Sequence, residues 1–350
     1  MTQKPWFLPL LIFLAIACLM VATAPLVPDT FGDRFSSVDD LDRPLIPELL
    51  ARAAQNGAPK FLPQVARYRF FACVLFAAAA TGLFIRMRSR YPTSVAWIAL
   101  LGLLTMPREF AAAHTATDSA MAASCVILSW ALFPIACRGL IGLTWWLAAV
   151  SLGVVLDFRV FVLVPFTAVG LFGDGSQKTR SEAGRVLMAG LLCMIALPYL
   201  IQAVLRYDPD FVRSGFRFDF VSRFKFDLHG LSVELLSCPD WQLFFAVFGF
   251  WSAFRHYRQD PERPALAILA IVVALVLDGP ARLVFIAPIA ALGAGRMLYR
   301  GTLTKSFRIP PPTWAIILVT IAAIRSAVIM ITRAPHWDEY VNRIGIWLGG

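Results

Sequence analysis

Long apolar runs separated by short polar connections dominate this 350-residue sequence. A helix needs about 20 apolar residues to cross a bilayer, and inside lipid only helices and closed barrels satisfy their backbone hydrogen bonds. The runs are too long for barrel strands, so we expect helices near 6–25, 66–85, 94–107, 114–136, 140–156, 160–172, 186–205, 241–254, 265–277 and 283–298, with an eleventh at 313–332. The pair 140–156 and 160–172 is either one broken helix or two short spans that meet at a charged turn. The sequence therefore predicts an all-α, polytopic integral membrane protein with about 10–11 transmembrane helices.

The composition excludes the main alternatives to a membrane protein. Hydrophobic residues make up 59% and charged residues 15% of the chain, whereas a soluble domain has about 25% charged residues. The formal charge of +10 would suit a nucleic-acid partner. The charges lie, however, in short clusters between the apolar runs, where membrane topology places them. We therefore expect a single membrane domain over 1–350 and no nucleic-acid partner.

Lys and Arg are unevenly distributed between the two sets of loops, which predicts the orientation of the chain. The denser set holds Lys4, Arg86, Arg88, Arg90, Arg138, Lys178, Arg180, Arg185, Arg255, Arg258, Arg263, Arg296, Arg300, Lys305 and Arg308. Because cytoplasmic loops carry the excess of basic residues, we expect a cytoplasmic N-terminus in a bacterial-type inner membrane, with the first helix as an uncleaved signal anchor. The outer face then has two long loops, 26–65 and 206–240, and a short tail, 333–350.

The first outer loop carries adjacent acids ahead of an amphipathic segment. Over 44–55 the apolar side chains share one helical face and Asn56-Gly57 provides a C-terminal stop, so we expect a helix in the membrane plane. Asp39 and Asp40 precede it at the water boundary, where carboxylates can act as a general base or hold a divalent cation. The alternative is a solvated acidic cap that stabilises the N-terminus of this helix.

Asp118, Arg159 and Arg282 lie at the ends of apolar runs. Asp118 opens a span, where it is either an N-cap or a functional acid. Arg159 follows Asp157, so the two either pair with each other or leave the planar guanidinium to bind a phosphate. Arg282 would either bind the same anion or extend toward water.

The second long loop alternates aromatic and basic residues, with Arg217 and Arg223 among several phenylalanines. Such a pattern would also suit nucleic acid. On a membrane face it better suits anionic lipid headgroups or an aromatic-walled site for a sugar phosphate. Arg217 and Arg223 are therefore further candidates for phosphate binding, and membrane lipid is an expected partner.

Several segments form an ordered series of motifs. They are Asp39-Asp40 with the in-plane segment, Gly57 to Pro63, an arginine at 67 or 69, Pro107-Arg108, Thr117-Asp118, Gly153 to Arg159, Leu197-Pro198-Tyr199, and Arg282 to Pro288. This series resembles the GT-C superfamily of membrane glycosyltransferases, nearest to its protein mannosyltransferase and aminoarabinose (lipid A) transferase branch. Arg159 stands where that family has Lys, and Phe285 stands where it has Tyr. If 42–45 represents the family's Lys-Pro-Pro-Leu element, Asp29 or Asp33 replaces Asp39-Asp40 as the candidate acid.

The resemblance implies an inverting glycosyltransferase that takes a sugar from a polyprenyl phosphate at the outer, periplasmic face. It implies that Asp40 or Asp39 is the base and that Asp118 orients the site or helps to hold a divalent cation. Arg159 and Arg282, with Arg217 or Arg223, would bind the donor phosphate.

Two alternatives remain beside the enzyme. The motifs are degenerate and the chain is short, so a non-catalytic GT-C-derived subunit that binds lipid or a partner membrane complex is the second hypothesis. A transporter would predict inverted repeats, and the sequence has no such symmetry.

Overall fold

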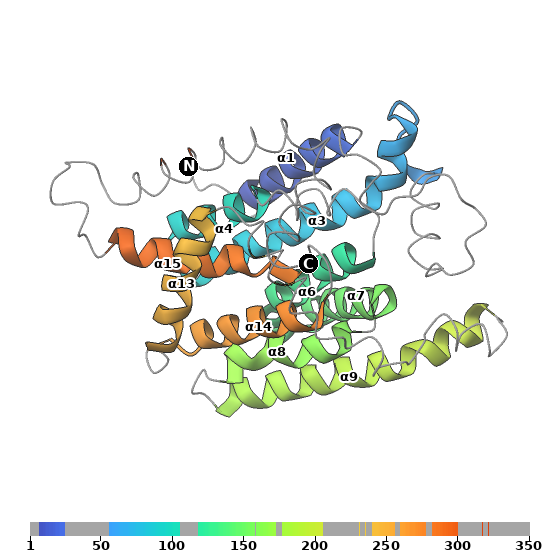
Figure 1. The fold of residues 1–350 in the computed structure, drawn as a ribbon. Coiled ribbons are helices and arrows are strands. Elements are labelled where there is room, and N and C mark those ends of the chain that lie inside the picture. Colours follow the sequence, from blue (N-terminus) through green and yellow to red (C-terminus); the bar gives the residue numbers. More distant parts are fainter. Residues whose placement is uncertain are drawn as a thin grey trace, which may run out of the picture.

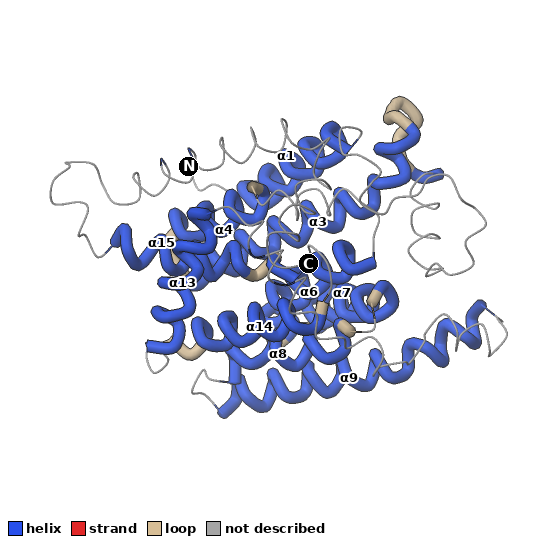
Figure 2. Tube along the Cα trace, viewed as in Figure 1, coloured by secondary structure: helices blue, strands red, loops and turns tan. Residues whose placement is uncertain are grey.

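We describe a computed structural model of the chain over residues 7–24, 56–105, 118–157, 159–172, 177–205, 231, 235, 240–255, 260–277, 282–299, 317 and 321. Every regular element in this part of the chain is a helix (Figure 2). The long helices are α1 (Phe7–Thr23), α3 (Gln64–Arg90), α4 (Thr93–Leu104), α6 (Asp118–Ala136), α7 (Leu140–Leu156), α8 (Val160–Phe172), α9 (Gln177–Leu205), α13 (Asp240–Arg255), α14 (Glu262–Val276) and α15 (Ile286–Tyr299).

Each of the ten spans predicted from 6 to 298 coincides with one of these helices, so the all-α prediction is confirmed. The segments 140–156 and 160–172 are two separate helices, α7 and α8. We call the short connection between them, which includes Asp157 and Arg159, the α7–α8 corner. The helix α3 is long and apolar enough over Arg69–Arg90 to cross a bilayer, and several shorter apolar helices accompany it. The eleventh span, the in-plane segment up to residue 55 and the short tail lie outside the described residues, although Asn56 and Gly57 are helical.

The helices alternate in direction, and contacts between distant segments identify which of their ends lie together. Arg69, early in α3, donates a hydrogen bond to the carbonyl oxygen of Ala24 after α1. Gln242, early in α13, donates to the carbonyl oxygen of Gly102 near the end of α4. We call this end of the bundle the Arg69 end. At the opposite end, the Glu262 end, the last turn of α3 contacts the first residue of α14. In Figure 1, α1 and α3 lie on one side of the bundle and α8, α9 and α14 on the other.

Charge and hydrophobicity are distributed over the bundle as a bilayer requires. The described members of the denser basic set occur at or near helix termini at the Glu262 end, so they share one end of the bundle as predicted. Between the two ends, large apolar side chains are exposed on the flanks of the helices, among them Leu10, Leu14, Trp145, Leu192, Val247 and Ile271. Such a surface is stable in contact with lipid tails and would be costly in water.

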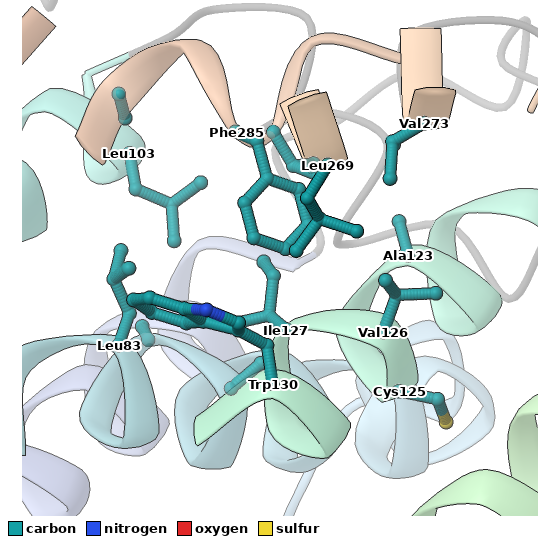
Figure 3. Close-up of a cluster of buried hydrophobic side chains, with 14 of the residues drawn as sticks. Leu83, Leu103, Ala123, Cys125, Val126, Ile127, Trp130, Leu269, Val273 and Phe285 are labelled. Carbon is teal, nitrogen blue, oxygen red and sulfur yellow. The ribbon is translucent and has the colours of Figure 1, made fainter. Parts of the chain in front are cut away.

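Trp130 of α6 and Phe285, just before α15, lie at the centre of the core. Their rings pack edge to face with centroids 6.1 Å apart, and Figure 3 shows Leu83 and Leu103 beside them. Phe285 is completely buried, and Arg282, Leu283 and Val284 before it are 5% exposed or less. The described part of the connection from α14 to α15, over 282–285, therefore lies inside the bundle. A connection at that depth is tolerated only where protein surrounds its backbone.

Two glycines allow α13 and α15 to pack backbone to backbone. A Cβ atom added to Gly293 would collide with the carbonyl oxygen of Phe245, and one added to Gly249 would collide with that of Ile289. Small residues at helix crossings are typical of membrane proteins, where close packing replaces the hydrophobic effect as the force between helices.

We predict that Gly293→Ala lowers the thermal unfolding midpoint of the detergent-solubilised protein, because the new methyl group forces α15 away from α13. Overpacking of this kind costs about 1–3 kcal/mol. The matched control is Gly184→Ala in α9, where an added Cβ meets nothing within 4 Å and alanine favours the helix. Equal midpoints for the two variants would contradict the close crossing.

Candidate functional site

Arg69 anchors the start of α3 to the end of α1. Its side chain is fully buried, and Nη1 lies 2.7 Å from the carbonyl oxygen of Ala24. Side chains on a helix lean toward its N-terminus, so an arginine in the second turn of α3 reaches the Arg69 end of the bundle. The first long loop, with its candidate acids, begins directly after Ala24.

Arg282 is the second buried cation at this end. It is 5% exposed, and its Nε donates a hydrogen bond to the carbonyl oxygen of Leu277 at 2.7 Å. Leu277 closes the last turn of α14, so Arg282 joins the end of that helix to the start of α15. Of the two alternatives for Arg282, extension to water does not occur in the structure, because the side chain turns back into the connection. Its binding of an anion stays a prediction.

Arg159 and Asp157 form an ion pair at the corner between α7 and α8. The Nη2 and Nε atoms of Arg159 lie 2.7 Å and 3.0 Å from Oδ2 of Asp157, and Nε also lies 3.0 Å from Oδ1. The backbone N–H of Arg159 donates to Oδ1 at 3.0 Å. The side chains are only 11% and 3% exposed. Of the two alternatives for this pair, mutual pairing is therefore the one present in the structure.

The same corner is packed closely against α6. A Cβ on Gly153 would lie 3.0 Å from Cβ of Cys125 and 3.0 Å from Cγ1 of Val160. The Gly153 carbonyl oxygen accepts the backbone N–H of Asp157 at 2.8 Å, which closes α7. Glycine at this position lets three helices meet, so that Asp157 and Arg159 are held in a nearly dry environment.

Arg69, Arg159 and Arg282 come from widely separated segments and share one end of the bundle by its topology. Both α14 and α6 pack against α8, and α3 packs against α6, so the three connections belong to neighbouring helices. Asp118 is the first residue of α6 at the same end, but its side chain is outside the described part. Asp39, Asp40, Arg217 and Arg223 also lie outside it, and their roles stay predictions.

Gln242 was not anticipated from the sequence. It is fully buried, its Nε2 donates to the Gly102 carbonyl oxygen at 2.6 Å, and its Oε1 has no hydrogen-bond partner among the described residues. An amide in the first turn of an apolar helix was the only available signal. Polar groups inside a membrane bundle are rare and tend to serve function.

The described residues include no group of three His, Cys, Asp or Glu side chains that could hold a metal ion. A divalent cation at the first-loop acids and Asp118 remains a prediction, since those carboxylates lie outside the described side chains.

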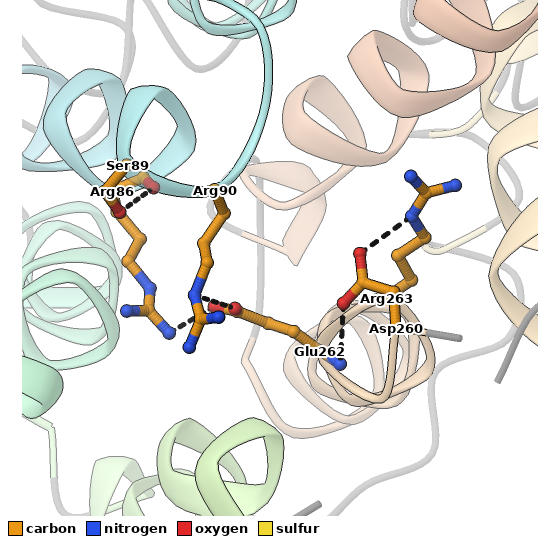
Figure 4. A network of polar contacts seen from close by, with 6 residues as sticks. All are labelled: Arg86, Ser89, Arg90, Asp260, Glu262 and Arg263. Atoms are coloured by element: carbon orange, nitrogen blue, oxygen red, sulfur yellow. Dashed lines mark hydrogen bonds and ion pairs between the residues drawn. The ribbon is translucent and has the colours of Figure 1, made fainter. Parts of the chain in front are cut away.

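The Glu262 end is held together by a second polar network (Figure 4). The Glu262 carboxylate pairs with Arg86 and lies 2.9 Å from Nε of Arg90. The Arg86 guanidinium also lies over the ring of Trp130, 5.5 Å from its centroid. Burial and the carboxylates of Asp260 and Glu262 raise the pKa of Tyr91, so the phenol stays protonated. The network joins α3 to α14.

No protein-family model and no curated protein sequence matches the chain. Solved structures do match it. The apo oligosaccharyltransferase of Archaeoglobus fulgidus superposes with a TM-score of 0.57 at 13% identity, over 95% of this chain and 56% of that one. ArnT from Cupriavidus metallidurans, crystallised with undecaprenyl phosphate, superposes with a TM-score of 0.55 at 15% identity, over 97% and 75%.

This chain has the GT-C fold. Both neighbours are membrane glycosyltransferases of the GT-C superfamily, so the resemblance expected from the ordered motifs is confirmed at the level of fold. The chain spans 56% of the archaeal oligosaccharyltransferase. At 13% and 15% sequence identity, the structural similarity establishes the GT-C membrane fold. The identity of the sugar donor and of the acceptor depends on individual site residues.

We predict that Glu262→Ala destabilises the GT-C bundle strongly, because it leaves Arg86, which is 7% exposed, buried beside an empty position. Removing one partner of a buried pair costs about 3–5 kcal/mol. Arg263→Ala is the control, since its pair with Asp260 is partly exposed and such pairs contribute about 1 kcal/mol or less. Thermal melts in detergent measure both, and a loss for Glu262→Ala no larger than for Arg263→Ala would contradict the prediction.

Proposed function

We propose that this protein is a membrane glycosyltransferase that transfers a sugar from a polyprenyl-phosphate donor to an acceptor at the Arg69 end of the bundle. The observation that carries the proposal is the GT-C fold over nearly the whole chain. One of the two structures that share this fold was crystallised with undecaprenyl phosphate. The buried arginines at the Arg69 end support it, because a lipid phosphate in a low-dielectric site needs fixed cations.

The leaving group makes the strongest demand on the site. As the sugar–phosphate bond breaks, the polyprenyl phosphate gains negative charge, and cations that are already in place stabilise this transition state without reorganisation. Arg282 is our first candidate for this role, since its position is fixed by the Leu277 carbonyl oxygen. Arg159 is the second, with Arg217 and Arg223 from the second long loop as further candidates.

The acceptor hydroxyl needs a base. We propose Asp40 or Asp39, with Asp29 or Asp33 under the alternative alignment, and we propose that Asp118 orients the site or helps to hold a divalent cation. The acceptor oxygen attacks the anomeric carbon while the bond to the phosphate oxygen breaks. The hydroxyl proton passes to the carboxylate and the polyprenyl phosphate leaves, so a single displacement inverts the anomeric centre.

We expect Arg282→Met to weaken the binding of undecaprenyl phosphate by about tenfold or more, since a hydrogen bond to a charged group contributes about 1.5–3 kcal/mol. Arg88→Met is the control, because Arg88 is exposed at the Glu262 end. Native mass spectrometry of the detergent-solubilised protein measures both affinities. Identical affinities in the two variants would remove Arg282 from the phosphate site.

We expect at least one of Asp39→Asn and Asp40→Asn to abolish sugar transfer in membranes, because the amide cannot accept the proton of the acceptor hydroxyl. We expect Asp118→Asn to abolish it as well, because the amide lacks the negative charge that would orient the site or help to hold a divalent cation. Transfer of radiolabelled sugar from total polyprenyl-linked donors measures the effect. Unchanged sugar transfer in all three variants would contradict the proposed glycosyltransferase activity. A wild-type protein that binds undecaprenyl phosphate, transfers no sugar and co-purifies stoichiometrically with a larger membrane complex would favour the non-catalytic subunit.

A further inference from the structure

The ion pair at the α7–α8 corner places a carboxylate on the same guanidinium that the proposed function offers to the donor phosphate. We propose that Asp157 is a built-in counter-anion that competes with the lipid phosphate for Arg159 and limits how tightly the site holds it. This inference rests on the proposed function, and it gives Asp157 a role that neither the motifs nor the fold assigns. Asp157 acts through Arg159, so it is a positioning residue.

The geometry shows how fully the carboxylate occupies this side of the guanidinium. Both Nε and Nη2 of Arg159 donate to it, at 3.0 Å and 2.7 Å. A planar guanidinium binds a carboxylate or a phosphate through the same paired donors. A phosphate that approaches Arg159 therefore meets an edge already bound to an anion.

Burial makes this competition significant. The Asp157 side chain is 3% exposed and that of Arg159 is 11% exposed, so water screens their charges poorly. As a pair they contribute no net charge to the Arg69 end. A phosphate that binds Arg159 therefore also meets the negative charge of the Asp157 carboxylate, which repels it.

A purely structural role predicts a different response. The carboxylate also accepts the backbone N–H of Arg159 at 3.0 Å, a turn bond that an asparagine side chain makes equally well. Asp157→Asn therefore retains the turn and removes the charge. If Asp157 only shaped the corner, this substitution would leave phosphate binding unchanged or weaken it. If it competes for Arg159, binding becomes tighter, because Coulomb repulsion between two anions at one guanidinium outweighs the loss of orientation.

The experiment measures the affinity of wild type and Asp157→Asn for undecaprenyl phosphate by native mass spectrometry, with thermal melts to verify folding. We expect about tenfold tighter binding in the variant. Asp157→Ser, which removes the charge with a shorter side chain, should shift the affinity in the same direction. Phosphatidylglycerol is measured in parallel, and equal tightening for it would assign the site to bilayer headgroups in general.

A double-mutant cycle shows whether the effect acts through Arg159. In the Arg159→Met background, Asp157→Asn should leave the affinity unchanged. Weaker or unchanged binding of undecaprenyl phosphate in Asp157→Asn and Asp157→Ser would overturn the inference. The same gain in affinity in the Arg159→Met background would also overturn it. In either case Arg282→Met still tests the proposed function. Failure of the wild-type protein to bind undecaprenyl phosphate would instead contradict the proposed function itself.

Discussion

The need to satisfy buried arginines inside an apolar bundle organises this protein. A guanidinium removed from water must find acceptors, and each one named below takes an acceptor from a segment distant in sequence or from a helix end. Arg69 binds the carbonyl oxygen that follows α1, Arg282 binds the end of α14, and Arg86 pairs with Glu262. These contacts add directional hydrogen bonds at the helix ends to the close packing between the helices.

The two ends of the bundle use this constraint differently. At the Glu262 end the network pairs arginines with carboxylates and is largely self-neutralised. At the Arg69 end, the described contacts of Arg69 and Arg282 include hydrogen bonds to backbone carbonyl oxygens. Under the proposed function, these fixed cations would stabilise the charge of a lipid phosphate.

Much of the fold could be predicted from the sequence, because bilayer thickness fixes the length of an apolar helix. The span predicted at 66–85, for example, lies within α3 (Gln64–Arg90). The series of motifs also indicated the GT-C fold, although each motif alone is weak. The partners of the charged residues could not be predicted in this way. Whether Arg159 pairs with Asp157 depends on the turn between them, and the position of Arg282 depends on a connection that enters the core. Gln242 gave only a faint signal, because a single amide in an apolar run does not reveal which helix it faces.

In the proposed function, a polyprenyl phosphate binds at the Arg69 end. An experimental structure of the protein in lipid nanodiscs with undecaprenyl phosphate tests this binding most directly. We predict phosphate density within hydrogen-bonding distance of the guanidinium of Arg282 or Arg159. Density for the phosphate at the Glu262 end, or lipid density confined to the outer flanks of the helices, would contradict it.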